Sequence, residues 1–173
     1  IPFHRSDLVP LCIILDKRAK IDDSEEYHKG LFEIQDEGSQ LISYALSPNG
    51  NCNILDACAG AGGKTLHLSD ISPDAKEIVA SDNDYLRLKQ FSKRLNRYNK
   101  SIIKTKLIKS MDFEQLNILL NFKQFDYILV DAPCSGLGTA RRDPLKKFRT
   151  TEKIADKMHD KQLDILSTYS KFV

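Results

Sequence analysis

The chain has 173 residues, enough for one well-packed domain and too few for two ordinary ones. Its composition, 41% hydrophobic and 29% charged, is typical of a globular protein and excludes wholesale disorder. The net charge of +2 conceals an asymmetry, because residues 1–82 carry 7 basic and 14 acidic side chains whereas residues 83–173 carry 19 and 10.

The basic half would suit an RNA-facing surface, since cations on the phosphate backbone release counterions. On charge alone, an ordinary solvated surface is slightly favoured. No apolar run approaches membrane-spanning length, and IPFHRSDL at the start has no signal-peptide pattern, so we expect a soluble, cytoplasmic protein without membrane contact. The four cysteines form no C-x-x-C pair and the four histidines are scattered, so neither a metal site nor a disulfide framework is expected.

We divide the chain into a lead-in segment, residues 1–30, and a main domain, residues 31–173. In the lead-in, LCIIL (11–15) could form a strand, and the polar residues 20–30 are expected to form a loop or turn. The main domain begins with a predicted helix whose apolar stripe ends before Ser47-Pro48-Asn49-Gly50. The chain lacks an initial Met and stops within a helical pattern, from which we expect a fragment of a longer protein. We also expect a monomer.

Residues 53–65, NILDACAGAGGKT, predict a strand, a Gly-rich turn and a helix. Such a turn lets the backbone approach a ligand, and the helix N-terminus offers it free N–H groups. A P-loop would need glycine at Cys58, and a dinucleotide fingerprint starting at Gly60 would need it at Thr65, so both phosphate motifs fail. The turn could also simply connect a strand and a helix.

A second strand, residues 77–81, ends at Asp82, which lies about where Rossmann-like folds place the acid that binds ribose hydroxyls. Asp82 could instead cap the next helix, and Asp84 could do so equally well. That helix, residues 84–99, has an apolar stripe and an opposite basic face that we interpret as solvated, with RNA contact as the less favoured alternative. The members of the basic face are Lys93, Arg94, Arg97 and Lys100.

A third strand, residues 102–108, is followed by Asp112 and a predicted helix over 113–122. The fourth, residues 125–131, is a nearly continuous apolar run, as expected of a central strand buried on both faces. Asp131 and Cys134 then lie at its carboxyl end, where open α/β sheets bind ligands. Residues 150–173 form a last helical pattern, whose apolar stripe comprises Ile154, Met158, Ile165, Tyr169 and Phe172.

The Asp56, Cys58, Gly60 and Gly62 spacing resembles motif I of class I S-adenosylmethionine-dependent methyltransferases, with Cys58 replacing the usual first glycine. DACAGAGGKT, IVASDND and FDYILVDAPCSGLGTARRDP together resemble the bacterial ribosomal-RNA cytosine-5 methyltransferase family, the RsmB or Sun group. VDAPCSG is the most specific stretch. The family usually has Ala-Pro where this chain has Gly60-Ala61, which makes the turn less rigid.

The resemblance implies an α/β, Rossmann-like class I methyltransferase core with a parallel sheet, truncated at its C-terminus. The four strands are expected in the spatial order 3-2-1-4, with Asp56, Asp82 and Asp131 along one edge. The resemblance also implies S-adenosylmethionine as cofactor, with Asp112 beside the adenine. Asp112 could also cap a helix. Lys64 is expected to orient the ligand or the reacting base. The expected cofactor-binding residues are Ala57, Cys58, Ala59, Gly60, Ala61, Gly62, Gly63, Lys64, Asp82, Asp112 and Asp131.

Cytosine C5 is a poor nucleophile, and transient addition of a Cys thiolate to C6 activates it. The DAPC motif supplies Cys134 and Asp131 as candidate catalytic residues. DNA cytosine-5 methyltransferases attack with their Pro-Cys cysteine, whereas the RNA family attacks with a downstream Thr-Cys cysteine. The resemblance therefore assigns Cys134 to product release and places the nucleophile beyond Val173, so the fragment is expected to be inactive by itself. A buried structural thiol is the alternative.

A basic cluster follows the DAPC motif and is expected to hold RNA phosphates: Arg141, Arg142, Lys146 and Lys147. The target base must leave its stack, so the substrate should be single-stranded or locally opened RNA. The family implies 16S ribosomal RNA, with transfer RNA a close alternative. A catalytically inactive RNA-binding module and a nucleotide-dependent oxidoreductase are alternatives from other classes, and the failed dinucleotide fingerprint argues against the oxidoreductase.

Overall fold

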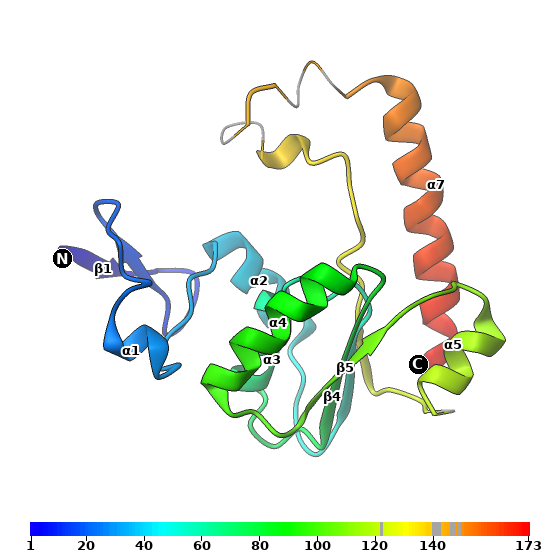
Figure 1. Ribbon diagram of the computed structural model, residues 1–173, viewed down its shortest axis with the longest axis horizontal. Coiled ribbons are helices and arrows are strands. Elements are labelled where there is room, and N and C mark those ends of the chain that lie inside the picture. The colour runs from blue at the N-terminus through cyan, green and yellow to red at the C-terminus, as the bar shows by residue number, and fades with distance from the viewer. Residues whose placement is uncertain (122, 140–142, 146–147, 149) are drawn as a thin grey trace.

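The computed structural model describes residues 1–121, 123–139, 143–145, 148 and 150–173. Its centre is a parallel sheet of four strands in the order β5-β4-β3-β6 (Figure 1). The strands are β3 (Asn53–Asp56), β4 (Glu77–Asp82), β5 (Ile103–Leu107) and β6 (Tyr127–Leu129). This is the predicted order 3-2-1-4, and the predicted α/β, Rossmann-like fold is confirmed.

The fourth strand differs from the prediction. β6 comprises Tyr127–Leu129 instead of residues 125–131, and in the described part of the chain it pairs with β3 alone. Tyr127 and Ile128 are half-buried, so the apolar run does not mark a central strand here. The apolar run in the sequence is longer than strand β6 because it includes Phe125, which is buried under the end of the chain. The Phe125 amide donates to the Phe172 carbonyl at 2.7 Å.

Alternate side chains of the central strands enter two separate cores, as the period of two in a β-strand requires. Ile54 and Ile78 face α3 (Gly63–Ile71) and α4 (Tyr85–Tyr98). Leu55 and Val79 face α5 (Phe113–Leu119) and α7 (Glu152–Tyr169). Figure 1 shows the two helix layers on opposite sides of the sheet. Because β3 and β4 are buried on both faces, their sequences are mostly continuous apolar runs instead of alternating apolar and polar residues.

Capping residues mark the starts and ends of the predicted helices. Asp36 caps the start of α2 (Glu37–Leu46), and Ser47 ends it in the left-handed conformation. Asp84 caps α4, Asn99 ends it in the same way, and Asp112 caps α5. A short 3-10 helix, η1 (Leu137–Thr139), follows the DAPC motif.

The lead-in segment has more structure than predicted. Strands β1 (Phe3–Arg5) and β2 (Ile13–Leu15) form an antiparallel pair, and the polar stretch expected to be a loop contains a one-turn helix, α1 (Glu25–His28). Ser24 caps α1 through its side chain, a local signal that could have predicted the turn of helix. The segment contacts α2, because the Ser6 hydroxyl donates to the Glu37 carboxylate.

The last predicted helix is only partly packed. Its C-terminal half, which continues into η2 (Ser170–Phe172), buries Ile165, Tyr169 and Phe172 as the predicted stripe requires. At its start, Ile154 remains 39% exposed, so the stripe does not meet the core along its whole length. None of the helices described combines the length and apolar character needed to cross a membrane.

Gly62 is required at the turn for two reasons. Its φ is +83°, and a Cβ atom there would fall inside the ring of Phe91. We expect Gly62→Ala to lower the free energy of unfolding by about 1–2 kcal/mol for the left-handed backbone and about 1–3 kcal/mol more for overpacking. Urea denaturation measures the change.

Gly50→Ala is the matched control, because Gly50 has φ +65° and a Cβ atom added there would meet nothing within 4 Å. Gly50→Ala should therefore lower the free energy of unfolding only by the cost of the left-handed backbone. Equal losses for the two variants would mean that Phe91 moves aside without cost.

Candidate functional site

The Gly-rich loop, residues 57–63, lies at the carboxyl edge of the sheet, between the ends of β3, β4 and β6. A cavity of about 380 Å³ lies against it, with the loop residues Ala57–Gly60 on one side and Asp82 on another. Asp131 and Cys134 line it from the segment after β6, and Ile165 and Tyr169 line it from the C-terminal half of α7. The topology thus gathers at one cavity the acids and the cysteine that follow different strands of the sheet.

Asp82 fixes the loop. One of its carboxylate oxygens accepts from the Gly60 amide at 2.7 Å, and the other accepts from the Asp84 amide at 2.7 Å. Asp84 in turn caps α4 by accepting from the Leu86 and Arg87 amides at 2.8 and 3.1 Å. The helix-cap role that the sequence left open therefore belongs to Asp84, and Asp82 is a loop anchor at the cavity wall.

Asp112 is the N-cap of α5, where its side chain accepts from the Gln115 amide at 3.1 Å. Of the neighbouring residues, Ile108 and Met111 line the larger cavity and Asp112 does not. The contact between Asp112 and an adenine stays a prediction.

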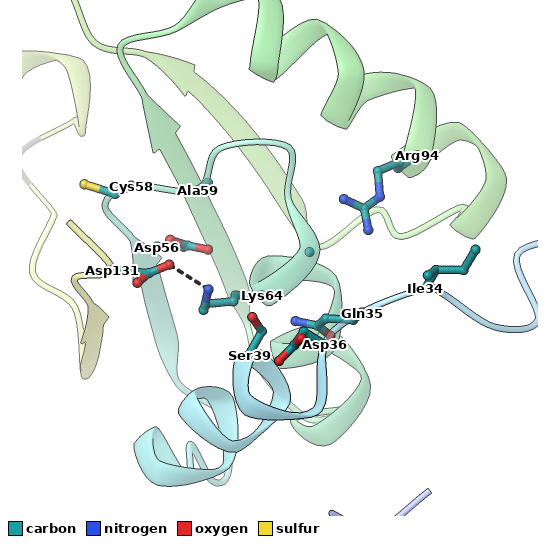
Figure 2. Close-up of a pocket in the computed structure, with 11 residues that line it drawn as sticks. Ile34, Gln35, Asp36, Ser39, Asp56, Cys58, Ala59, Lys64, Arg94 and Asp131 are labelled. Atoms are coloured by element: carbon teal, nitrogen blue, oxygen red, sulfur yellow. Dashed lines mark hydrogen bonds and ion pairs between the residues drawn. The ribbon is translucent and has the colours of Figure 1, made fainter. Parts of the chain in front are cut away.

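A second cavity of about 250 Å³ adjoins the first and shares Cys58, Ala59 and Asp131 with it. Figure 2 shows the ammonium group of Lys64 directed at Asp131, with Asp56 close to both. The Lys64 Nζ to Asp131 Oδ2 distance is 2.6 Å. This ion pair joins the first turn of α3 to the end of β6, and only 18% of the lysine side chain is exposed.

Asp56 lies beneath this pair and is 1% exposed. Thr65 donates its hydroxyl to Asp56 Oδ2 at 2.7 Å, whereas Oδ1 has no partner among the described residues, and Asp56 lines the smaller cavity. Burial raises the pKa of Asp56 from 3.8 to about 6, and the Thr65 hydroxyl and the Lys64 charge oppose that rise. The group therefore titrates close to neutral pH.

The two cysteines at the larger cavity differ in accessibility. Burial, followed by the Asp56 and Asp82 charges, raises the pKa of the Cys58 thiol to about 12, so it stays protonated. Cys134 is exposed, and its sulfur accepts from the Gly136 amide at 3.4 Å. The structure thus contradicts the alternative of a buried structural thiol at Cys134.

Some cavity residues were not predicted. The sequence pattern placed Ile165 and Tyr169 on an apolar helical stripe, yet both also form the cavity wall, and Lys161 of α7 reaches the same cavity. From residues 34–39, Gln35 and Ser39 line the smaller cavity. A helical stripe cannot indicate that its end faces a ligand site, so nothing local in the sequence identified them.

The interpretation of the basic face of α4 as solvated is wrong for two of its members. The side chains of Arg94 and Arg97 are 21% and 16% exposed, and both pair with Glu33. Lys93 is exposed, as expected. The predicted phosphate-binding residues, Arg141, Arg142, Lys146 and Lys147, lie outside the described residues.

Comparison with known proteins assigns this geometry to a family. Residues 43–173 match the family model described as 16S rRNA methyltransferase RsmB/F. This chain belongs to that family. The predicted resemblance is therefore confirmed, and the Gly-rich loop and the DAPC motif both lie within the matched residues.

Members of the RsmB/F family with curated names are similar over most of this chain. A probable ribosomal RNA small subunit methyltransferase B of Coxiella burnetii is 32% identical over 163 residues, which is 93% of this chain and 37% of the relative. The Bacillus subtilis protein of the same name is 33% identical over 147 residues, 85% of this chain and 32% of the relative. The chain thus spans about a third of the length of these relatives.

Solved structures support the fold. A methyltransferase homologue from Pyrococcus horikoshii superposes with a TM-score of 0.81 at 26% identity, covering 99% of this chain and 52% of its own. The NSun6 protein of the same organism, crystallised with SFG, gives a TM-score of 0.78 at 24% identity, covering 90% and 38%. At that identity, the second comparison shows the shared fold only.

The titration of Asp56 predicts a pH dependence of stability. Because folding raises its pKa, the folded protein binds more protons than the unfolded chain between about pH 4 and 6, and stability falls as the pH rises through this window. Relative to wild type, Asp56→Asn should gain about 2 kcal/mol in unfolding free energy between pH 4 and 7, because each pKa unit is worth about 1.4 kcal/mol and part of the effect lies below pH 4.

Urea denaturation of both proteins at each pH measures this difference. A difference that does not change with pH would show that Asp56 ionises as readily in the folded protein as in the unfolded chain.

Proposed function

We propose that this chain is the catalytic core of an S-adenosylmethionine-dependent RNA methyltransferase that modifies cytosine C5, with 16S ribosomal RNA as its substrate. The observation that carries the proposal is the meeting of Lys64, Asp131 and Cys134 beside the Gly-rich loop. Family membership supports RNA as the substrate class. The names of the relatives support ribosomal RNA of the small subunit.

The two adjoining cavities fit a nucleoside that is joined to an amino acid. Volumes of about 380 and 250 Å³ suit a site for one small molecule divided into two compartments. The unsatisfied Asp56 oxygen beside the smaller cavity favours a ligand with a hydrogen-bond donor, because buried acceptors rarely stay unsatisfied. When bound, S-adenosylmethionine supplies an electrophilic methyl group.

We place the adenosine in the larger cavity, where Asp82 has lone pairs left for the ribose hydroxyls after its two amide bonds. Ile108 and Met111 offer apolar contact to the adenine, with Asp112 close by in sequence to accept from its amine. The amino-acid group belongs in the smaller cavity, beside Asp56 and Lys64. Of the loop, Ala57–Gly60 line the larger compartment, and Cys58, Ala59 and Gly63 line the smaller one.

The chain's own residues then act on the pyrimidine. Asp131 is paired with Lys64. We propose that Asp131 accepts a hydrogen bond from the cytosine or exchanges a proton with the cytosine. Cys134 lies three residues further along the same cavity wall, and we assign it to product release. Gln162 donates to the Pro133 carbonyl at 3.0 Å and so steadies the backbone next to Cys134.

The resemblance to the RNA family implies that a second cysteine, in a downstream Thr-Cys motif, attacks C6. Cys12 and Cys52 are buried, and the Cys58 thiol, with its pKa raised to about 12, is a poor nucleophile. We therefore place the attacking cysteine outside residues 1–173 and propose that this chain binds cofactor without turnover. Arg141, Arg142, Lys146 and Lys147 follow Cys134 closely in sequence, and we propose that they contact RNA phosphates.

Asp82→Ala should weaken binding of S-adenosylhomocysteine by about 1–3 kcal/mol, the cost of leaving buried polar groups unpaired. Isothermal calorimetry measures this, and NAD should not bind to either protein. Asp84→Ala is the control, because it removes the helix cap and leaves the cavity wall in place. Equal affinities for wild type and Asp82→Ala would contradict the placement of the ribose.

The roles of the cysteines are separated in a longer version of the chain that includes the segment after Val173. With ribosomal RNA and labelled S-adenosylmethionine, Cys134→Ala should accumulate a covalent protein–RNA adduct, because attack occurs and release fails. Denaturing gel electrophoresis detects the adduct, and transfer RNA tests the alternative substrate. Loss of all adduct, or robust turnover by residues 1–173 alone, would show instead that Cys134 attacks.

A further inference from the structure

The Gly-rich loop has few side chains with which to hold itself in place, and within it the Gly62 amide donates to the Ala59 carbonyl at 2.9 Å. Its side chains are hydrogen atoms, methyl groups and one thiol, and Gly60 and Gly62 have φ values of +55° and +83°. On the side of the sheet, the Ala59 amide donates to the Ser81 carbonyl at 2.9 Å and the Gly60 amide to Asp82 at 2.7 Å. These two bonds anchor the first half of the loop.

The second half is held from α4. Arg94 donates through Nη1 to the Ala61 carbonyl at 2.8 Å and through Nε to Glu33 Oε2 at 3.0 Å. Arg97 donates to the same Glu33 oxygen at 2.8 Å, and its guanidinium lies 3.8 Å from the centre of the Tyr27 ring. Because Glu33 is 12% exposed, solvent weakens these charged hydrogen bonds less than it would on an open surface.

We propose that Glu33 and Arg94 form a clamp that keeps the loop in its ligand-binding conformation, Arg94 through the Ala61 carbonyl and Glu33 through Arg94. Both are positioning residues. Glu33 lines neither of the two cavities described above, so it reaches the ligand site only through Arg94. The identity of the ligand as S-adenosylmethionine rests on the proposed function, whereas the clamp itself rests on these contacts.

The energetic role of such a clamp is preorganisation. A loop with two glycines at positive φ has many alternative conformations, and the apparent affinity for a ligand falls with the fraction of molecules whose loop is competent to bind. Arg94 also lines the smaller cavity, so its charge could act on the ligand directly. The two roles differ in what they require: a direct effect needs a cation near the cavity, and the clamp needs a group that bridges Glu33 and Ala61.

Three variants separate the roles. Glu33→Gln keeps the side-chain shape and removes the charge that both arginines share. Arg94→Lys keeps the cation, but a single ammonium group lacks the fork of donors that bridges two acceptors. Glu77→Gln is the matched control, because Glu77 is another partly buried glutamate, paired with Lys123 at the start of β4, away from the loop.

Two measurements are made on each protein: hydrogen exchange of the Gly60 and Gly62 amides without ligand, and calorimetric affinity for S-adenosylhomocysteine. For Glu33→Gln and Arg94→Lys we expect exchange to accelerate about tenfold and the dissociation constant to rise about five- to tenfold. Glu77→Gln should leave both unchanged.

Unchanged exchange and affinity in Glu33→Gln would overturn the clamp, and so would wild-type behaviour of Arg94→Lys, which would assign Arg94 a direct charge effect. If Arg94→Lys does not fold, Glu33→Gln decides. If the wild-type chain does not bind S-adenosylhomocysteine, the proposed cofactor is wrong, and the exchange rates still decide whether the clamp holds the loop.

Discussion

The geometry of the site depends on one carboxylate that accepts hydrogen bonds from two backbone amides. A loop made of alanine, glycine and one cysteine is positioned mainly through its main chain, because it has few side chains to pack. Asp82 meets this constraint at the end of β4, where one oxygen holds the Gly60 amide and the other holds the Asp84 amide. The loop, the strand end and the start of α4 thereby become one unit, and the larger cavity takes its shape from it.

The two hydrophobic cores, one on each side of the sheet, fix the position of this unit. β3 and β4 are buried on both faces, so α3 and α4 cannot shift on one side without changing the packing of α5 and α7 on the other. Phe91 of α4 lies directly against Gly62, which links the packing of a core helix to the backbone of the turn. The geometry of the site is therefore set by the same contacts that stabilise the domain.

The fold was predictable because its signals are local. Apolar runs, strand ends marked by Asp56 and Asp82, and caps such as Asp84 each occupy a few consecutive residues. The site was predictable where a motif carried it and not where distant segments meet. The pairing of Glu33 with Arg94 spans 61 residues, and periodicity placed that arginine on a solvated face. The short β6 was overestimated because the apolar run includes Phe125, which packs beneath Phe172 and not in the sheet.

The contact between α7 and the sheet has a consequence for biosynthesis. The Tyr169 hydroxyl lies 3.4 Å from that of Ser81, and the Phe172 carbonyl accepts from the Phe125 amide, so the last wall of the larger cavity is added by residues far along the chain from the loop it faces. A nascent chain emerges from the ribosome N-terminus first. Translation can thus complete the Gly-rich turn and all four strands while the pocket still lacks one side. The larger cavity is therefore enclosed on this side only after Lys161, Ile165 and Tyr169 have left the exit tunnel.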